Sequence, residues 1–201
     1  MDVITEFNRL YLDIKHPWTE TSWLGQQIAK NPMDCWMYQE ILTRTKPDIL
    51  IETGSCIGGS AYFFASIMEL IDHGHVVTID KDHYPNQPKH HRITYLHGDS
   101  VDGDSILEIN DWVANGQRAM VVLDSDHTER HVLKELDSYA NLVAPGCYCV
   151  VEDTRADDDV NGAGRAVASY LASHPGQFDV DRECERHLLT FNPGGWLKRR
   201  A

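Results

Sequence analysis

The segment that most constrains this chain's fold is an apolar run followed by a glycine-rich turn. Residues 48–52 read Asp-Ile-Leu-Ile-Glu, and the turn after Glu52 has glycines at positions 54, 58 and 59 before a helix-like stretch that starts at Ser60. This order is typical of a buried strand that leads into a tight loop and the N-terminus of a helix. Glycine lets the backbone approach a ligand closely, and the first turn of a helix offers free N–H groups. We therefore expect a small-molecule site at this turn.

Two acidic strand ends favour a cofactor other than a dinucleotide. The Gly-x-x-x-Gly-Gly spacing of the turn differs from the Gly-x-Gly-x-x-Gly of dinucleotide-binding turns, and Glu52 lies where a pyrophosphate would be repelled. A second apolar run, residues 75–80, ends in Asp80. An acidic side chain at that place accepts hydrogen bonds from ribose hydroxyls in doubly wound sheets, and the alternative is that Asp80 caps the next element. Together these features predict S-adenosylmethionine, which carries a sulfonium, an ammonium and a ribose.

Composition and charge narrow the class of protein. A chain of 201 residues with 42% hydrophobic residues is long enough to bury a core as one domain. Its formal charge of −13 argues against binding the phosphate backbone of nucleic acids, and no run approaches the ~20 apolar residues that cross a membrane. The five cysteines lack zinc-ligand spacing, and the first residues do not resemble a signal peptide. We therefore expect a cytoplasmic protein with reduced thiols and neither a nucleic-acid nor a membrane partner.

Apolar runs and helical patterns alternate along most of the chain. Strands are expected at about 48–52, 75–80, 93–96, 119–124 and 148–152. Helices are expected at about 58–72, 103–115, 128–142 and 162–174. This alternation predicts a Rossmann-like, doubly wound α/β fold with a mostly parallel sheet. Residues 1–46 are expected to form a helical extension to a core at 47–201, and the segments 178–181 and 188–191 predict an antiparallel hairpin at the C-terminal edge.

Acidic side chains gather where two of the expected strands end. Asp124 and Asp126 follow one strand, and Glu152 and Asp153 follow the next. Because the carboxyl ends of parallel strands open on one crevice, three converging oxygen ligands there would suit Mg²⁺. Clustered carboxylates also repel one another and need a counter-ion. The alternative, for Asp126 in particular, is a helix cap, since Asp126 precedes Thr128 by two residues.

His127 follows this acidic pair and lies three residues beyond Asp124. An ordinary histidine pKa of about 6.5 suits a general base near neutral pH. We expect His127 to remove the proton from a substrate hydroxyl held at the metal, so that the oxygen can attack the sulfonium methyl group in line. The alternative is a surface histidine at the start of a helix.

Several of these segments together resemble one protein family, and the resemblance extends from about Trp23 to Arg199. The segments are residues 32–40, 51–60, 123–127, 151–154 and 189–197. They are similar to the cephalosporin hydroxylase/rhamnosyl O-methyltransferase family of natural-product and sugar pathways. The resemblance implies a class I methyltransferase fold that uses S-adenosylmethionine and magnesium and has an alcohol as substrate.

The family resemblance also implies roles for individual residues. The cofactor set that we expect from it and from the turn is Glu52, Gly54, Ser55, Ser60, Asp80, Asp99, Ser100 and Asp124, with Asp99 and Ser100 near the adenine. Related magnesium O-methyltransferases place a metal carboxylate at the end of the fourth strand and a base three residues later, which selects Asp124 and His127. Counting back from Glu152 selects Asp126 instead, so both carboxylates remain candidates.

We expect a magnesium-dependent O-methyltransferase that acts on a hydroxyl of a small molecule, sugar or natural-product intermediate, assembled as a homo-oligomer. One alternative is the hydroxylase that the family's first name suggests. An iron site of two histidines and one carboxylate would be needed for it, and the oxygen-only cluster does not match such a site. The other alternative is a non-catalytic protein with a cofactor fold that partners another enzyme, which the intact Asp124, Glu152 and Asp153 disfavour.

Overall fold

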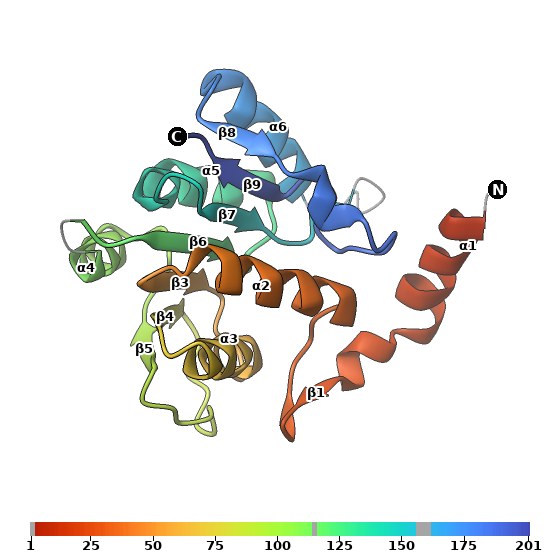
Figure 1. The fold of residues 1–201 in the computed structure, drawn as a ribbon, viewed down its shortest axis with the longest axis horizontal. Helices are drawn as coiled ribbons and strands as arrows, with labels where there is room; N and C mark the ends of the chain where they lie inside the picture. Colours follow the sequence, from red (N-terminus) through yellow and green to blue (C-terminus); the bar gives the residue numbers. More distant parts are fainter. Residues whose placement is uncertain (1–2, 114–115, 156–161) are drawn as a thin grey trace.

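The computed structural model describes residues 3–113, 116–155 and 162–201 and folds around one mixed β-sheet (Figure 1). Within these residues, seven strands run in the order β5-β4-β3-β6-β7-β9-β8. Their bounds are β3 Ile49–Thr53, β4 His75–Asp80, β5 Ile93–His97, β6 Ala119–Leu123, β7 Tyr148–Val151, β8 Phe178–Val180 and β9 Trp196–Arg199. Strands β3 to β7 pair in parallel, whereas β9 pairs antiparallel with both β7 and β8. The predicted doubly wound, mostly parallel sheet with antiparallel C-terminal strands is confirmed.

Helices cover both faces of the sheet (Figure 1). On one face lie α2 (Pro32–Thr45) and α3 (Gly59–Leu70). On the other lie α4 (Gly103–Trp112), α5 (Glu129–Tyr139) and α6 (Ala163–Ser173). The last two residues of the helix predicted at 103–115 lie outside the described residues. Because both faces are covered, β3, β6 and β7 are buried along their whole length, as parallel strands in this architecture usually are.

The alternation of side chains along the strands decides which residues face α2. Leu50, Val122 and Val150 belong to the core between the sheet and helices α2 and α3. The residues two positions later are Glu52, Asp124 and Glu152. Since strand side chains alternate with a period of two, these three carboxylates project towards the same side of the sheet. They therefore lie where α2 and the segment before it can reach them.

The first 46 residues are less uniformly helical than the sequence predicts. α1 (Val3–Arg9) continues into a π-helical turn (Leu10–Lys15) and a 3₁₀ turn (Pro17–Glu20), and a short antiparallel hairpin of β1 (Ser22–Trp23) and β2 (Gln26–Gln27) precedes α2. At the start of α2, Asn31 accepts a hydrogen bond from Met33 N and proline takes the first helical position. Within the described ranges, no helix is both long enough and apolar enough to cross a bilayer.

The second strand of the C-terminal hairpin is not where the sequence predicts it. Residues 188–191 are irregular, and β9 lies further along the chain and inserts between β7 and β8. The Phe191 N–H donates to Asp34 Oδ2 at 2.8 Å instead of to a neighbouring strand. Leu189 and Phe191 fill a small separate core next to the N-terminal helices. Packing of this apolar run against the N-terminal segment therefore overrides its preference for a strand.

Candidate active site

The carboxyl ends of β3, β4, β5 and β6 surround a cavity of about 380 Å³. Its wall includes five residues that the sequence assigns to the cofactor, namely Gly54, Asp80, Asp99, Ser100 and Asp124. It also includes Cys56, Tyr84, Gly98 and His131, for which sequence reasoning predicted no role. A parallel sheet binds ligands at this edge, so the cavity lies where the fold predicts one.

The glycine turn packs tightly against its neighbours. Gly54 has φ +87°, and a Cβ at this position would lie 2.0 Å from the carbonyl oxygen of Asp124. Gly58 has φ +80° and precedes the first residue of α3, and a Cβ there would meet the hydroxyl of Tyr95 at 2.6 Å. Both positions therefore require glycine for conformation and for space. At Gly54 the turn therefore brings its backbone to the wall of the cavity.

Glu52 lies directly before the turn and is fully buried. Thr78 donates a 2.6 Å hydrogen bond to its Oε2, whereas Oε1 is buried and accepts no hydrogen bond of normal geometry from the described residues. Burial raises the pKa of Glu52 to about 7, against the opposing effects of the Lys30 charge and the hydroxyls of Ser60 and Thr78. A buried carboxylate oxygen without a donor suits a ligand that brings an N–H or O–H group.

The two serines predicted at the turn both support Glu52. Ser55 is buried, and its Oγ lies 2.7 Å from Oγ1 of Thr78, the same hydroxyl that donates to Glu52. The side chain of Ser55 therefore points towards Thr78 on β4 and not into the cavity. Ser60, in the first turn of α3, lies near enough to lower the pKa of Glu52. A direct cofactor contact from either serine stays a prediction.

Asp80 fixes the loops on the β4 side of the cavity. Its Oδ2 accepts a hydrogen bond from Cys56 N at 2.8 Å, and its Oδ1 accepts one from Asp82 N at 2.9 Å. A carboxylate offers about four acceptor positions, so Asp80 can hold both backbone N–H groups and still accept ribose hydroxyls. The capping contacts are present in the structure, and the ribose contact stays a prediction.

A buried carboxylate on α5 supports the far wall of the cavity. Glu135 is fully buried, and its Oε1 accepts hydrogen bonds from Ser100 Oγ at 2.6 Å and from Ser125 Oγ at 2.7 Å. His131, one helical turn earlier, lies at the cavity with its Nε2 3.5 Å from Glu135. Asp99, beside Ser100, accepts a hydrogen bond from the backbone of its own loop. Nothing in the sequence marks Glu135, because a charged residue on an amphipathic helix ordinarily faces solvent.

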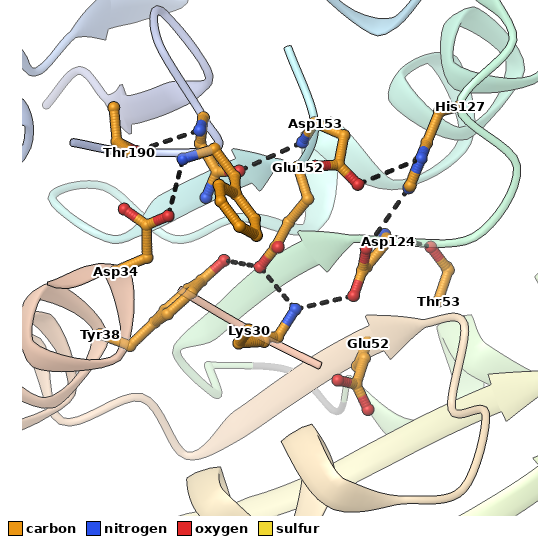
Figure 2. A network of polar contacts seen from close by, with 12 residues as sticks. Lys30, Asp34, Tyr38, Glu52, Thr53, Asp124, His127, Glu152, Asp153 and Thr190 are labelled. Atoms are coloured by element: carbon orange, nitrogen blue, oxygen red, sulfur yellow. Dashed lines mark hydrogen bonds and ion pairs between the residues drawn. The ribbon is translucent and has the colours of Figure 1, made fainter. Parts of the chain in front are cut away.

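A group of charged side chains adjoins the cavity at Asp124 (Figure 2). His127 bridges two carboxylates, with Nε2 3.3 Å from Asp124 Oδ1 and Nδ1 3.3 Å from Asp153 Oδ2. One donor atom from each of these three residues lies within 4.8 Å of the others, a spacing compatible with one metal ion. The ends of β6 and β7 thus bring together three residues that the sequence singled out.

Glu152 joins this group through two residues that sequence reasoning did not connect with the metal (Figure 2). The Nζ of Lys30 lies 2.7 Å from Glu152 Oε1 and 2.7 Å from Asp124 Oδ2. Tyr38 donates a 2.5 Å hydrogen bond to the same Glu152 oxygen. Burial and the charge of Asp124 raise the pKa of Glu152, while Lys30 opposes the shift. The buried Glu152 and the partly exposed Asp124 therefore share a buried lysine.

The start of α2 is tied to the C-terminal segment, which places Lys30 and Tyr38 at the site. Asn31 Nδ2 donates to the carbonyl of Leu189 at 3.2 Å, and Asp34 Oδ2 accepts from Phe191 N at 2.8 Å. These contacts join positions 158 and 157 residues apart in the chain. Burial raises the pKa of Asp34 to about 6, against the hydrogen bonds that favour its charged form.

Asp153 has an unusual backbone conformation. Its φ is +53°, a left-handed value that non-glycine residues adopt only at some cost. The Asp153 N–H donates to Oδ1 of Asn192, a fully buried side chain in the loop before β9. The strained conformation brings the Asp153 carboxylate to His127, so the strain lies at the converging group.

Asp126 lies at the cavity wall but outside the converging group. Its Oδ1 accepts a hydrogen bond from Thr128 N at 2.9 Å, directly before α5. This is the capping contact that the sequence offered as the alternative. Of the two carboxylates that were candidates for the metal, the structure brings Asp124 and not Asp126 to His127 and Asp153.

The charges around His127 shift its titration. Burial favours the neutral ring, but the hydrogen bond and charge of Asp124, with the charges of Asp153 and Glu152, raise the pKa of His127 to about 9. In the cation-free protein the ring is therefore protonated at neutral pH. The group then brings two basic side chains, His127 and Lys30, into contact with the carboxyl groups of Asp124, Glu152 and Asp153.

Comparison with known proteins gives consistent results. The family model described as rhamnosyl O-methyltransferase/CmcI matches residues 15–200. A rhamnosyl O-methyltransferase of Mycobacterium tuberculosis (strain ATCC 25618 / H37Rv) is 33% identical over 195 residues, which cover 90% of this chain and 79% of that protein. The protein of the same name from Mycobacterium leprae (strain TN) is also 33% identical, with 91% of this chain and 85% of that protein covered.

Solved structures share the fold at lower sequence identity. The structure described as "cmcI-D160 Mg-SAM" has a TM-score of 0.71 at 20% identity and covers 91% of this chain and 78% of that one. MycE in complex with Mg, SAH and mycinamycin VI has a TM-score of 0.55 at 16% identity, with 88% of this chain and 46% of that chain covered. The O-methyltransferase NovP has a TM-score of 0.57 at 13% identity, with 98% and 99% covered. On the family match and the mycobacterial relatives, the chain belongs to the rhamnosyl O-methyltransferase/CmcI family.

Proposed function

We propose that this chain is an O-methyltransferase that transfers the methyl group of S-adenosylmethionine to a hydroxyl of a small molecule, with Mg²⁺ as its cation. The observation that carries the proposal is the position of Asp124. This residue lines the cavity beside the glycine turn and also belongs to the converging group with His127 and Asp153. A cofactor and a cation would therefore lie next to each other. Family membership, and Mg with SAM or SAH in CmcI and MycE, support the proposal.

The cavity has the chemistry that S-adenosylmethionine requires. Asp80 has acceptor positions left for ribose hydroxyls, and the buried Oε1 of Glu52, which lies behind the cavity wall at the glycine turn, is an acceptor for the ammonium group. Gly54 leaves room for the cofactor to approach the backbone. When bound, the cofactor supplies an electrophilic methyl group on a sulfonium. The acidic surroundings favour this positively charged ligand over a pyrophosphate.

The carboxylates of Asp124 and Asp153, with that of Glu152 beside them, have the chemistry that Mg²⁺ requires. Asp124, Glu152 and Asp153 offer hard carboxylate oxygens, the ligands that this ion prefers. Bound magnesium would supply positive charge that stabilises a deprotonated hydroxyl. Asp126 accepts a hydrogen bond from Thr128 N and does not lie with His127 and Asp153, so we assign the cation to the other three carboxylates.

We assign the proton transfer to His127. The carboxylates of Asp124 and Asp153 flank both of its ring nitrogens, so they hold the imidazole in one orientation and stabilise it when it carries a proton. A cation on these carboxylates would weaken their hold on that proton and lower the pKa of His127 from about 9 towards the range of a general base.

The acceptor that we propose is a hydroxyl on a sugar or on a natural-product intermediate. The names of the mycobacterial relatives support a sugar, and the MycE complex supports a natural product. We further infer that the enzyme works in the cytoplasm, because all five cysteines are free, and that it forms a homo-oligomer. The exposed apolar side chains Val3, Phe7 and Ile14 on the N-terminal helices support an assembly.

The hydroxylase alternative receives no support from the site. An iron site of two histidines and one carboxylate would need a second histidine beside His127. Among the described residues, the converging group at this place consists of one histidine and two aspartates.

The test is a methyl-transfer assay with S-adenosylmethionine against a panel of glycosides and hydroxylated natural products. We expect formation of a methyl ether and of S-adenosylhomocysteine, loss of both on chelation, and recovery with Mg²⁺. Calorimetric binding of S-adenosylhomocysteine gives an independent result that needs no acceptor. Binding of a nicotinamide dinucleotide without binding of S-adenosylhomocysteine would overturn the proposal.

A further inference from the structure

Lys30 is a buried cation placed among the carboxylates that we assign to magnesium. Its side chain is only 3% exposed, and Nζ contacts Asp124 and Glu152 at 2.7 Å each (Figure 2). The lysine comes from the segment between β2 and α2, whereas the carboxylates follow β6 and β7. These are long-range contacts within a buried network, not a surface pair.

The surroundings of Lys30 make its charge necessary in the absence of a divalent cation. Burying an ionised group without a partner is strongly unfavourable. Removing one partner of a buried ion pair destabilises the fold for the same reason. Asp124 and Glu152 share Lys30, and the side chain of Glu152 is itself only 5% exposed. Tyr38 supplies Glu152 with a hydrogen bond but no charge. Lys30 is therefore the cation that lies between the buried Glu152 carboxylate and the Asp124 carboxylate, which is 22% exposed at the cavity.

The same charge must act on any divalent ion that binds these carboxylates. Lys30 and the ion would be neighbours, and like charges in a partly desolvated site repel one another. The lysine also occupies one oxygen of each carboxylate, Oδ2 of Asp124 and Oε1 of Glu152. Oδ1 of Asp124 faces His127 instead, which leaves that side of the group for the ion.

We propose that Lys30 is a built-in counter-cation of the metal site, a positioning residue that holds Asp124 and Glu152 before magnesium binds and weakens magnesium binding by its charge. This inference rests on the proposed function, because it assigns the divalent ion to the same carboxylates. A site of this kind keeps its geometry when the ion leaves, and it binds Mg²⁺ reversibly rather than as a permanent structural ion. Three carboxylates without the lysine would bind Mg²⁺ more tightly. In the absence of Mg²⁺, the folded protein would be less stable than the wild type.

The test compares Lys30→Met and Lys30→Gln with the wild type, by calorimetric titration of Mg²⁺ into the full chain without cofactor or acceptor. Methionine keeps the length of the side chain and removes its charge, and glutamine also keeps a hydrogen-bond donor. We expect both variants to bind Mg²⁺ about tenfold more tightly or better, the size of change that a repulsion of this kind gives in a partly desolvated site. Lys198→Met, at an exposed lysine on β9, removes the same charge elsewhere and should leave the affinity unchanged.

Thermal unfolding gives the second readout. In chelator, the two Lys30 variants should melt below the wild type, and Mg²⁺ should raise their melting temperature more than it raises that of the wild type. If the wild type binds Mg²⁺ and the folded variants bind it no more tightly, or more weakly, Lys30 is not a counter-cation and the inference fails alone. If neither wild type nor variants bind Mg²⁺ at millimolar concentrations, the metal assignment of the proposed function fails and the inference fails with it.

Discussion

The cofactor end of the crevice is held together by the close backbone contact of the glycine turn and by the backbone N–H groups that Asp80 accepts, whereas the acidic end consists of charged side chains packed against one another. At the first end, Gly54 touches the backbone of Asp124, and Asp80 receives two backbone N–H groups. At the second, Lys30 and His127 hold the carboxylates at 2.7 to 3.3 Å. The contacts of the glycine turn depend on the local backbone conformation. The contacts at the acidic end depend on each distant segment that supplies a charged side chain. The two ends should therefore respond to mutation in different ways.

The largest expected effect is at the acidic end, on replacement of His127 by alanine. Removing a general base typically lowers the rate about a hundred- to ten-thousand-fold. Because His127 is not part of the cavity wall, the affinity for S-adenosylhomocysteine should stay nearly the same. Single-turnover assays and calorimetry measure the two quantities.

The control for His127 is His187→Ala, at an exposed histidine, which should leave the rate unchanged. If His127→Ala loses cofactor affinity along with turnover, the two ends are not separate and His127 has a structural role. An unchanged rate would assign the proton transfer to another group.

The next largest effect is at the cofactor end, on Gly54→Ala. The added methyl group would meet the Asp124 carbonyl at 2.0 Å, and alanine would be strained at φ +87°. We expect a loss of roughly 3 kcal/mol or more in the free energy of unfolding, together with loss of cofactor binding. Urea denaturation followed by circular dichroism measures the free energy of unfolding.

Gly146→Ala is the matched control for this change. Gly146 has a similar φ of +80°, but an added Cβ there meets nothing within 4 Å. Gly146→Ala should lower the free energy of unfolding by only about 1 kcal/mol, because it adds backbone strain without a steric clash. Equal losses at the two positions would show that the close approach of the turn to β6 is unimportant.

A smaller effect is expected from Asp80→Ala. Hydrogen bonds to charged groups contribute about 1.5–3 kcal/mol, so loss of the ribose contacts should weaken S-adenosylhomocysteine binding roughly ten- to a hundredfold. Part of this loss would arise from release of the Cys56 and Asp82 backbone N–H groups. Calorimetry with adenosine and with 2′-deoxyadenosine separates the two contributions, since only the ribose contact discriminates between these ligands. Equal weakening for both ligands would favour the capping role of Asp80 alone.

The smallest expected effect is a dependence of stability on pH in the cation-free protein. The pKa of His127 rises from 6.5 to about 9 on folding, so the protonated ring stabilises the folded state. This contribution is fully present below pH 6.5 and is lost as the pH rises through about 9. Melting temperatures in chelator should therefore decline over this interval, and the decline should be shallower in His127→Gln. A wild-type melting temperature that increases with pH over the same interval would contradict this assignment.

The sequence predicts the cofactor end better than the acidic end because of these different constructions. The order of Glu52, the glycines and Asp80 is local, because Glu52 and Asp80 each lie at the carboxyl end of their own strand and the glycines follow the first of these strands. Asp124, His127, Glu152 and Asp153 follow from the rule that parallel strands end on one edge. Lys30 and Tyr38 do not follow from this rule. They are placed at the site by the contacts of Asn31 and Asp34 with a loop more than 150 residues away in the chain. The misplaced strand at 188–191 has the same cause, since that segment bonds to α2 instead of to the sheet.

The central claim is that one crevice holds S-adenosylmethionine and a divalent cation side by side, with Asp124 between them. It is tested most directly by anomalous diffraction from crystals grown with S-adenosylhomocysteine and Mn²⁺, an ion that carboxylate sites accept in place of Mg²⁺. We expect one strong manganese peak within bonding distance of Asp124, Glu152 and Asp153, and the nucleoside in the cavity against Gly54 and Asp80. A manganese peak only at another group, such as Glu69, His90 and His91, with the crevice empty of cofactor, would contradict the claim.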